Sequence, residues 1–201
     1  EIAITVTGAT DGRFDNNDQV LFYGTATDSD YVAENDSFIN PYTDDSYYYI
    51  TVDGAVGKRI LPLIQPTGVA AVTYDYYYAK HHYEVDERNI ASIGRIWYGE
   101  RFDFEPEQSF EFEFENVVST LPARIRITTG AVADNATSMS FNVNGQAIGS
   151  SNLSGIAGQN IRAASRANFL NNNTNLSSSA VTVTVSYNNN GNPGASGYLD
   201  Y

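Results

Sequence analysis

The stretch Ser109–Glu115, with the sequence SFEFEFE, alternates phenylalanine with glutamate and is the clearest strand pattern in the chain. Successive side chains of a β-strand point to opposite faces, so this stretch places apolar rings on one face and carboxylates on the other. Residues 123–128, 138–144 and 180–187 alternate in the same way. One buried and one solvated face are typical of antiparallel sheets.

Similar alternations continue along the chain, separated by turns rich in glycine, asparagine and aspartate, and helical periodicity is nearly absent. Further strands are predicted at residues 20–23, 47–52, 59–63, 72–85 and 161–169. Many strands of similar length favour a sandwich. The sequence therefore predicts an all-β fold, an antiparallel, jelly-roll-like β-sandwich preceded by a smaller strand-rich lobe.

The boundary between the two parts is predicted near Pro62 and Pro66, because proline cannot join the interior of a β-ladder. This gives an N-terminal lobe over residues 1–66 and a sandwich domain over residues 67–201. Both ends of the chain themselves have strand patterns, so we expect it to be a piece of a longer polypeptide and the first lobe to be truncated.

Composition excludes several classes of function. The 201 residues carry a net charge of −13, and residues 1–115 hold 22 of the 24 acidic side chains, so a nucleic acid partner would be repelled. The chain has no cysteine, which excludes disulfides and a thiol nucleophile within it. No apolar run approaches the roughly 18 to 20 residues that a membrane-spanning helix needs.

An acidic stretch near the N-terminus is a candidate calcium site. Asp11, Asp15 and Asp18 concentrate hard oxygen ligands in one short turn, although their spacing is not that of an EF-hand. The alternative is a solvated turn in which aspartate and asparagine side chains bond to their own backbone.

Residues 74–86 hold five tyrosines and both histidines of the chain. On a strand, His82, Glu84 and Asp86 would share one face, which makes a metal or acid–base cluster conceivable. Neighbours on that face stand about 7 Å apart, so the cluster would need partners from another strand. A histidine held by a carboxylate beside packed aromatic rings is the simpler interpretation.

A second motif, Gly94–Glu100, is a candidate contact between domains. Trp97 and Tyr98 lie between glycines and could fill a pocket between lobes, while Arg95 and Glu100 could form ion pairs across the interface. The alternative is that Trp97 nucleates the core of the sandwich.

The order of these motifs resembles the region ahead of the peptidase domain in PorU-type sortases of the type IX secretion system, within the gingipain-type cysteine peptidases of Bacteroidetes. Two long blocks carry the resemblance, DGRFDNNDQVLFYG at residues 11–24 and HYEVDERNIASIGRIWYGERF at residues 82–102. Shorter matches are NPYTD at residues 40–44 and GYLDY at residues 197–201.

The resemblance implies a large protein at the outer-membrane surface, or in the periplasm, of a Gram-negative bacterium. Such a protein removes the C-terminal sorting domain of secreted cargo and can join the cargo to anionic lipopolysaccharide. The family cleaves with a Cys/His pair in a following domain, and this chain lacks cysteine, so no catalytic residue is expected in it. Expected partners are the chain's own peptidase domain, cargo sorting domains and other secretion components, with the chain acting as a platform or interaction module.

Two rival functions remain open at the level of sequence. Abundant tyrosine and a jelly-roll pattern also suit a secreted carbohydrate-binding module that calcium would stabilise. A glycoside hydrolase with dispersed carboxylates is the third possibility, because the separation of its two acids is a property of the fold.

Overall fold

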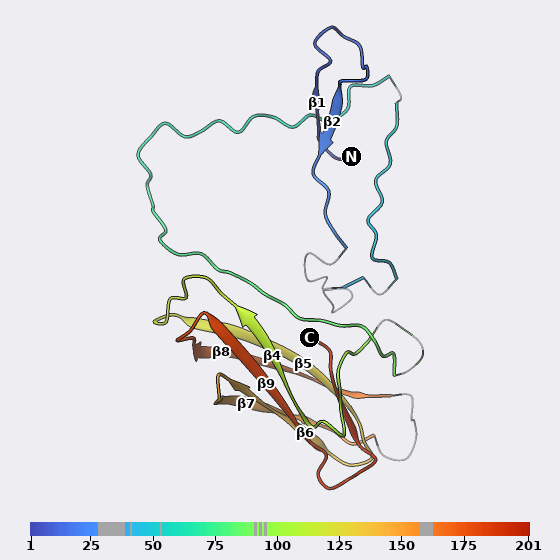
Figure 1. Ribbon diagram of the computed structural model, residues 1–201, viewed down its shortest axis with the longest axis vertical. Helices are drawn as coiled ribbons and strands as arrows, with labels where there is room; N and C mark the ends of the chain where they lie inside the picture. The colour runs from blue at the N-terminus through green and yellow to red at the C-terminus, as the bar shows by residue number, and fades with distance from the viewer. Residues whose placement is uncertain are drawn as a thin grey trace.

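The computed structural model describes residues 1–27, 39–40, 42–52, 54–90, 92, 94, 96–156 and 163–201. Within these residues all regular secondary structure is β-strand, which confirms the predicted all-β class (Figure 1). The strands are β1 (Ile4–Thr7), β2 (Gln19–Phe22), β3 (Arg101–Phe102), β4 (Glu107–Glu113), β5 (Pro122–Val132), β6 (Thr137–Val143), β7 (Gln146–Leu153), β8 (Ser165–Asn175), β9 (Ala180–Asn188) and β10 (Ser196–Leu199). In this part of the chain no helix has the length and apolar character needed to cross a bilayer.

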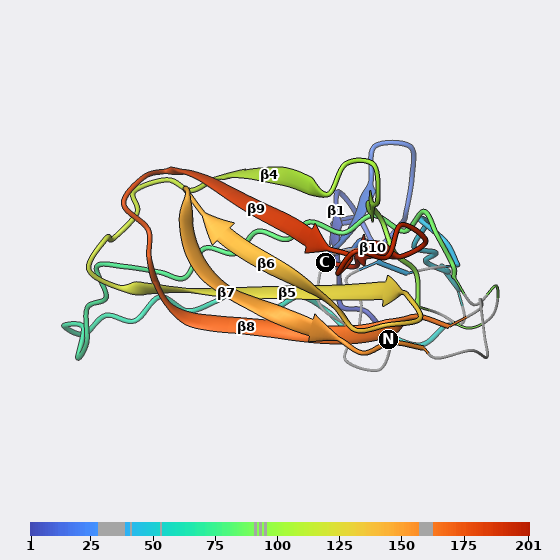
Figure 2. The same ribbon diagram turned by 90° about the horizontal axis from the view of Figure 1, so that it is seen from below.

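Eight of these strands build the predicted antiparallel sandwich. The first sheet has the order β3-β10-β5-β8, and the second has the order β4-β9-β6-β7. Every pairing within the two sheets is antiparallel. The long strands of both sheets run roughly in one direction (Figure 2), as in aligned sandwich packing.

The core lies between the two sheets and follows from the alternating pattern of the strands. In β6 every second residue, from Thr137 to Val143, is buried. The rings of Phe141 on β6 and Phe169 on β8 lie 4.6 Å apart between centroids and join the two sheets. The largest side chains with less than 2% exposure are Phe102, Phe141, Met139, Leu153 and Val185.

A two-residue turn connects β6 and β7 and fixes their register. Asn144 and Gly145 have φ angles of 49° and 80°, as a type I′ hairpin turn requires, and Val143 pairs with Gln146 across it. The Asn144 side chain accepts a hydrogen bond from the Thr182 amide at 2.8 Å and donates one to the Ala180 carbonyl at 3.3 Å. The turn is thereby attached to the start of β9.

Gly145→Ala should lower the free energy of unfolding by about 1 kcal/mol, because a Cβ makes the left-handed conformation unfavourable. No atom lies within 4 Å of the position that this Cβ would take, so the cost is conformational and not steric. Gly68→Ala is the control, since Gly68 also has open space around it but no positive φ. Urea unfolding of both variants measures the difference; equal stability of the two would contradict the assignment.

The N-terminal part of the chain contains a separate hairpin of β1 and β2. Residues 58–60 lie along the other side of β1. The Ile4 amide donates to the Lys58 carbonyl, and the Ile4 carbonyl accepts from the Ile60 amide, both at 3.0 Å. Figure 1 shows this hairpin set apart from the sandwich. All strands of the two large sheets fall within the predicted second domain, residues 67–201, while the exact boundary at residues 66 and 67 stays a prediction.

Three predicted strands are wrong. The described residues of 47–52, 59–63 and 72–85 are extended but do not form β-strands. Their only β-type pairing in the described chain is one isolated bridge between Ile4 and Arg59. Tyr49 and Val52, for example, are 91% and 98% exposed. Alternating residues favour an extended backbone, but a strand also needs a neighbouring strand with which to exchange hydrogen bonds, and these segments have none along their length.

Candidate interaction site at the edge of the first sheet

The first sheet is extended at one edge by residues that precede β3. The Tyr98 amide donates to the Arg88 carbonyl at 2.9 Å, and the Arg88 amide donates to the Tyr98 carbonyl at 2.8 Å. The Gly99 amide in turn donates to the Leu199 carbonyl at 2.8 Å. We call residues 83–88 and 98–102, with the β10 residues against which they lie, the seam.

Tyr98 is a deeply buried side chain of the seam, with 3% exposure. Its ring lies 5.7 Å from the ring of Tyr198 and covers Gly130 on β5, where a Cβ would come within 2.6 Å of the ring. Burial raises the pKa of Tyr98 to about 12, and the negative charge of Asp200 raises it further than the nearby Arg166 lowers it. Tyr98 is therefore a neutral anchor between the preceding segment and the sandwich.

Glu100 links the seam to the second sheet through Tyr83. The Tyr83 hydroxyl donates a short hydrogen bond to Oε1 of Glu100, and the Tyr83 ring lies 4.9 Å from that of Phe110 on β4. Burial, followed by this bond to the Glu100 carboxylate, raises the pKa of Tyr83 to about 12. Tyr83 thus stays a hydrogen-bond donor at any physiological pH.

Asp200, which follows β10, forms a buried ion pair with Arg166 of β8 beside the seam. Its Oδ2 accepts hydrogen bonds from Nη2 and Nε of Arg166 at 2.5 and 3.1 Å, and Asp200 is only 4% exposed. Burial raises the pKa of Asp200 to about 7; Arg166 acts against this rise, and the charges of Glu84 and Asp86 add to it. Burial, with a contribution from Glu84, also raises the pKa of Asp86 to about 6.

These carboxyl groups can therefore bind protons near neutral pH. The chain has no cysteine, so a thiol nucleophile is absent from the seam. In the described parts of the chain, no three histidine, aspartate or glutamate side chains are grouped so that they could hold a metal ion. The chemistry of the seam is that of an internal contact with proton-sensitive groups.

The structure places two of the four predicted interface residues, Tyr98 and Glu100, in the seam, and Trp97 directly before it. Tyr98 is buried, Trp97 and Glu100 are half-buried, and Arg95 lies outside the described residues. Trp97 does not belong to the core cluster of buried residues found in the described chain, and its contact with a further domain stays a prediction. Sequence reasoning missed Arg166 and Asp200. The available signal for Asp200 was a lone acid directly after β10, between Leu199 and Tyr201.

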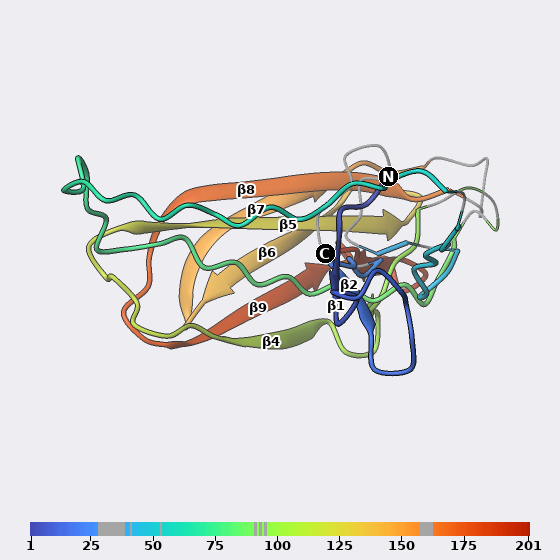
Figure 3. The same ribbon diagram turned by 90° about the horizontal axis from the view of Figure 1, so that it is seen from above.

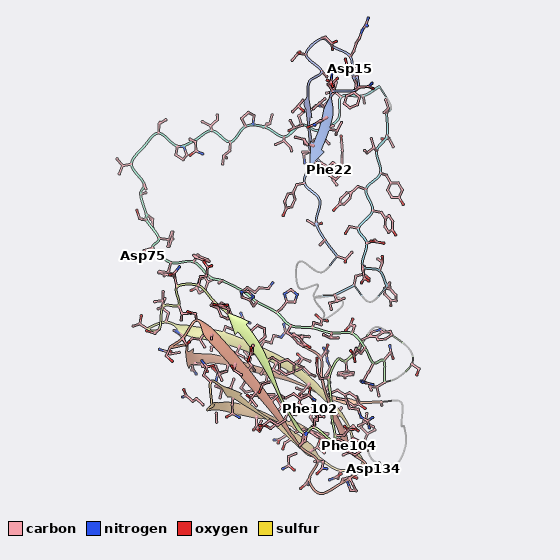
Figure 4. All side chains as sticks on the ribbon, viewed as in Figure 1. Asp15, Phe22, Asp75, Phe102, Phe104 and Asp134 are labelled. Carbon is pink, nitrogen blue, oxygen red and sulfur yellow. The ribbon has the colours of Figure 1, made fainter. Side chains whose placement is uncertain are left out.

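The predicted calcium ligands lie in the turn between β1 and β2, where Figure 4 labels Asp15. The Asp11 carboxylate accepts from the Arg13 amide at 2.9 Å, and the Asp15 carboxylate accepts from the Asn17 amide at 3.3 Å. The Asp18 carboxylate accepts from the Asp15 amide at 2.9 Å. All three carboxylates thus bond to their own turn, and their role as calcium ligands stays a prediction.

The two histidines lie beside the second sheet. The His81 ring packs edge-on against Phe114, with 4.8 Å between ring centroids. His82 is exposed, and the conceivable cluster of His82, Glu84 and Asp86 is not a metal-holding group in the described structure. His81 therefore serves as a packing contact beside the end of β4.

Comparison with known proteins gives distant structural similarities. No protein-family model and no curated protein matches the chain. Dimeric latent PorU from Porphyromonas gingivalis is 20% identical over 58% of this chain and 11% of the PorU chain, with a TM-score of 0.46. The carbohydrate-binding module CBM36, in complex with calcium and xylotriose, is 12% identical over 60% of this chain and 87% of its own, with a TM-score of 0.39. A CBM36-1 domain of a multidomain xylanase from the hindgut metagenome of Trinervitermes trinervoides is 15% identical over 61% and 84%, with a TM-score of 0.38.

Proposed function

We propose that this chain is a non-catalytic interaction module of a type IX secretion sortase, in which it precedes the peptidase domain and supports it. The two sequence blocks at residues 11–24 and 82–102 support this proposal, as does the absence of cysteine. The proposal places the parent protein outside the inner membrane of a Gram-negative bacterium, at the cell surface or in the periplasm. Cleavage of cargo sorting domains would then belong to the following domain.

The observation that carries the proposal is the exposure of apolar side chains between Tyr42 and Tyr78. Fourteen large apolar side chains in this stretch, which we call the aromatic segment, are at least 63% exposed. Val69 is fully exposed, and Tyr49 and Tyr78 are each 91% exposed. Large apolar side chains exposed in this number are typical of interaction sites, and tyrosine is enriched in protein interfaces. The aromatic segment is therefore the part of the molecule best suited to cover another protein surface.

The charge distribution supports a second element of the proposal, the attraction of a basic partner. Residues 1–115 hold 22 acidic and 7 basic side chains, so the part of the chain that contains the aromatic segment has a strong negative potential. Such a field increases the rate at which a basic partner arrives, and salt screens it. Rates of association should therefore fall as ionic strength rises.

The proposal is tested by measuring binding of the chain to a purified PorU-type peptidase domain by surface plasmon resonance. We expect specific binding whose association rate falls with salt, and the triple variant Tyr49→Ser, Val52→Ser, Ile64→Ser should bind roughly tenfold more weakly. The matched control is Phe104→Ser, because Phe104 is 96% exposed but lies outside the aromatic segment. Absence of binding, or equal binding of the triple variant, would contradict the proposal.

A carbohydrate-binding module is the second candidate, favoured by the same exposed tyrosines. Tyr76 and Tyr78, for instance, form an edge-on pair with 6.4 Å between ring centroids, and an exposed ring could stack on a sugar. A glycan array, read with and without calcium, separates the two candidates. Saccharide binding that Tyr78→Ser abolishes, together with a calcium-dependent rise in melting temperature, would favour the carbohydrate-binding module.

A further inference from the structure

One half of the sandwich has fewer strands in the first sheet than in the second. β10 pairs with β5 from Thr129 to Val132, and the residues after β10 extend this contact to Thr128, whose amide donates to the Tyr201 carbonyl at 2.6 Å. β5 itself begins at Pro122 and pairs with β8 along its other side. Among the described strands, none lies beside residues 122–127 on the β10 side. No described strand therefore continues the line of β10 along this half of β5.

A cavity marks this position. It has a volume of about 400 Å³ and is lined by inward-facing side chains of both sheets, including Phe110, Phe112, Ile125, Ile127 and Val183. This volume is within the range of ligand pockets in proteins. Phe110 and Phe112 are only half-buried, because nothing in the first sheet faces them fully. The floor of the cavity is thus apolar and can accept further apolar side chains.

The mouth of the cavity lies between β5 and residues 80–83. Figure 3 shows this segment crossing the sandwich from above, between β5 and β9. The contacts of His81 with Phe114 and of Tyr83 with Phe110 hold it against the second sheet. The opening is therefore a groove with β5 on one side and an extended segment on the other. We call it the β5 groove.

The charges around the β5 groove are opposite to those of the rest of the molecule. Its lining includes Lys80, Arg124 and Arg126, along with both histidines. None of the described residues that line it is aspartate or glutamate, although the chain has a net charge of −13. Arg124 and Arg126 lie on the outward face of β5, where they alternate with the inward Ile125. The groove therefore combines an apolar floor with a basic rim.

We propose that the β5 groove binds an extended peptide strand of a partner protein, in which apolar and acidic residues alternate. Added beside β5 in line with β10, such a strand would place its apolar side chains on the phenylalanine floor and its carboxylates beside Arg124 and Arg126. Residues 122–127 provide a length of about 20 Å at 3.4 Å per residue, which suits a strand of about six residues. This site is separate from the aromatic segment and does not depend on the proposed function.

The test uses a fluorescent probe peptide of alternating glutamate and valine, about seven residues long to match the groove, and measures its anisotropy with the 201-residue chain. We expect saturable binding, and a lysine–valine peptide should bind roughly tenfold more weakly because of the basic rim. The double variant Arg124→Glu, Arg126→Glu should weaken binding of the glutamate–valine probe and strengthen binding of the lysine–valine peptide. Arg13→Glu, in the exposed turn between β1 and β2, is the control for overall charge and should change the binding of neither peptide.

Two further arms separate a strand from other occupants. A probe whose alternate amides are N-methylated keeps its side chains but loses donors for pairing with β5, so its binding should be lost. Dodecanoate, an apolar chain with one carboxylate, should compete weakly. The proposal is overturned if the probe does not bind, if the N-methylated probe binds as well, if charge reversal leaves the preference unchanged, or if dodecanoate displaces the probe at lower concentration than the unlabelled peptide does.

Discussion

Replacing Phe102 by alanine should lower the free energy of unfolding by about 3–5 kcal/mol, the range for a fully buried phenylalanine whose removal leaves a cavity. Phe102 has 0% exposure, lies in β3 and belongs to the main core cluster. The measurement is urea unfolding followed by circular dichroism. The large effect is expected because Phe102 fixes the edge of the first sheet to the core, so the loss should also loosen the seam.

Phe104→Ala is the matched control, since the same substitution two residues further along the chain removes a ring that is 96% exposed. Figure 4 shows both residues on the same short segment of chain. The control should change stability by no more than about 0.5 kcal/mol. If the two variants were equally stable, the placement of β3 against the core would be wrong.

Arg166→Met should destabilise the protein by about 3 kcal/mol at a pH of about 8, because it leaves the Asp200 carboxylate buried without its cation. The penalty should depend on pH. Burial already raises the pKa of Asp200 to about 7 in the folded protein, above its usual 3.8, so the folded state binds more protons than the unfolded state between these values. Stability from this group is therefore fully present below its usual pKa and is lost as pH rises through about 7.

Without Arg166 the folded pKa of Asp200 rises further, so the variant loses more stability than the wild type as pH increases. The difference in unfolding free energy between the two should thus be smaller at a pH of about 5 than at about 8. Urea unfolding at both values measures it, with Arg124→Met, an exposed arginine of β5, as the control. A penalty that is independent of pH would show that Asp200 keeps an ordinary pKa. Adding Asp200→Asn to Arg166→Met should remove most of the pH dependence.

The strands of the sandwich could be predicted because their alternation reflects their final environment. Ser109–Glu115 contains most of β4, and the patterns at residues 123–128, 138–144 and 180–187 lie in or overlap β5, β6 and β9. Residues 72–85 alternate almost as well and form no named strand. The difference lies in the availability of a neighbouring strand, and the sequence of a single segment carries no information about its neighbours.

The seam was partly predictable for a similar reason. Tyr98 and Glu100 stood out as an aromatic and a charged residue on either side of Gly99, and both lie at the seam. The pairing of Arg166 with Asp200 depends on the order of the strands, because β8 and β10 lie on opposite sides of β5. In this register Gly130 pairs with Arg166 on one side and with Tyr198 on the other. The arginine bonds to Asp200 from the far side of β5, and this could not be read from the separate segments.

The contact between Tyr98 and Gly130 also has a consequence for how homologous sequences can diverge. The tyrosine ring fills the space that any side chain at position 130 would need. A lineage that keeps an aromatic ring at position 98 should therefore keep glycine at position 130, and a residue such as alanine or serine should arise at 130 only where a small side chain has replaced the ring. The two positions are expected to covary although they stand 32 places apart in the sequence.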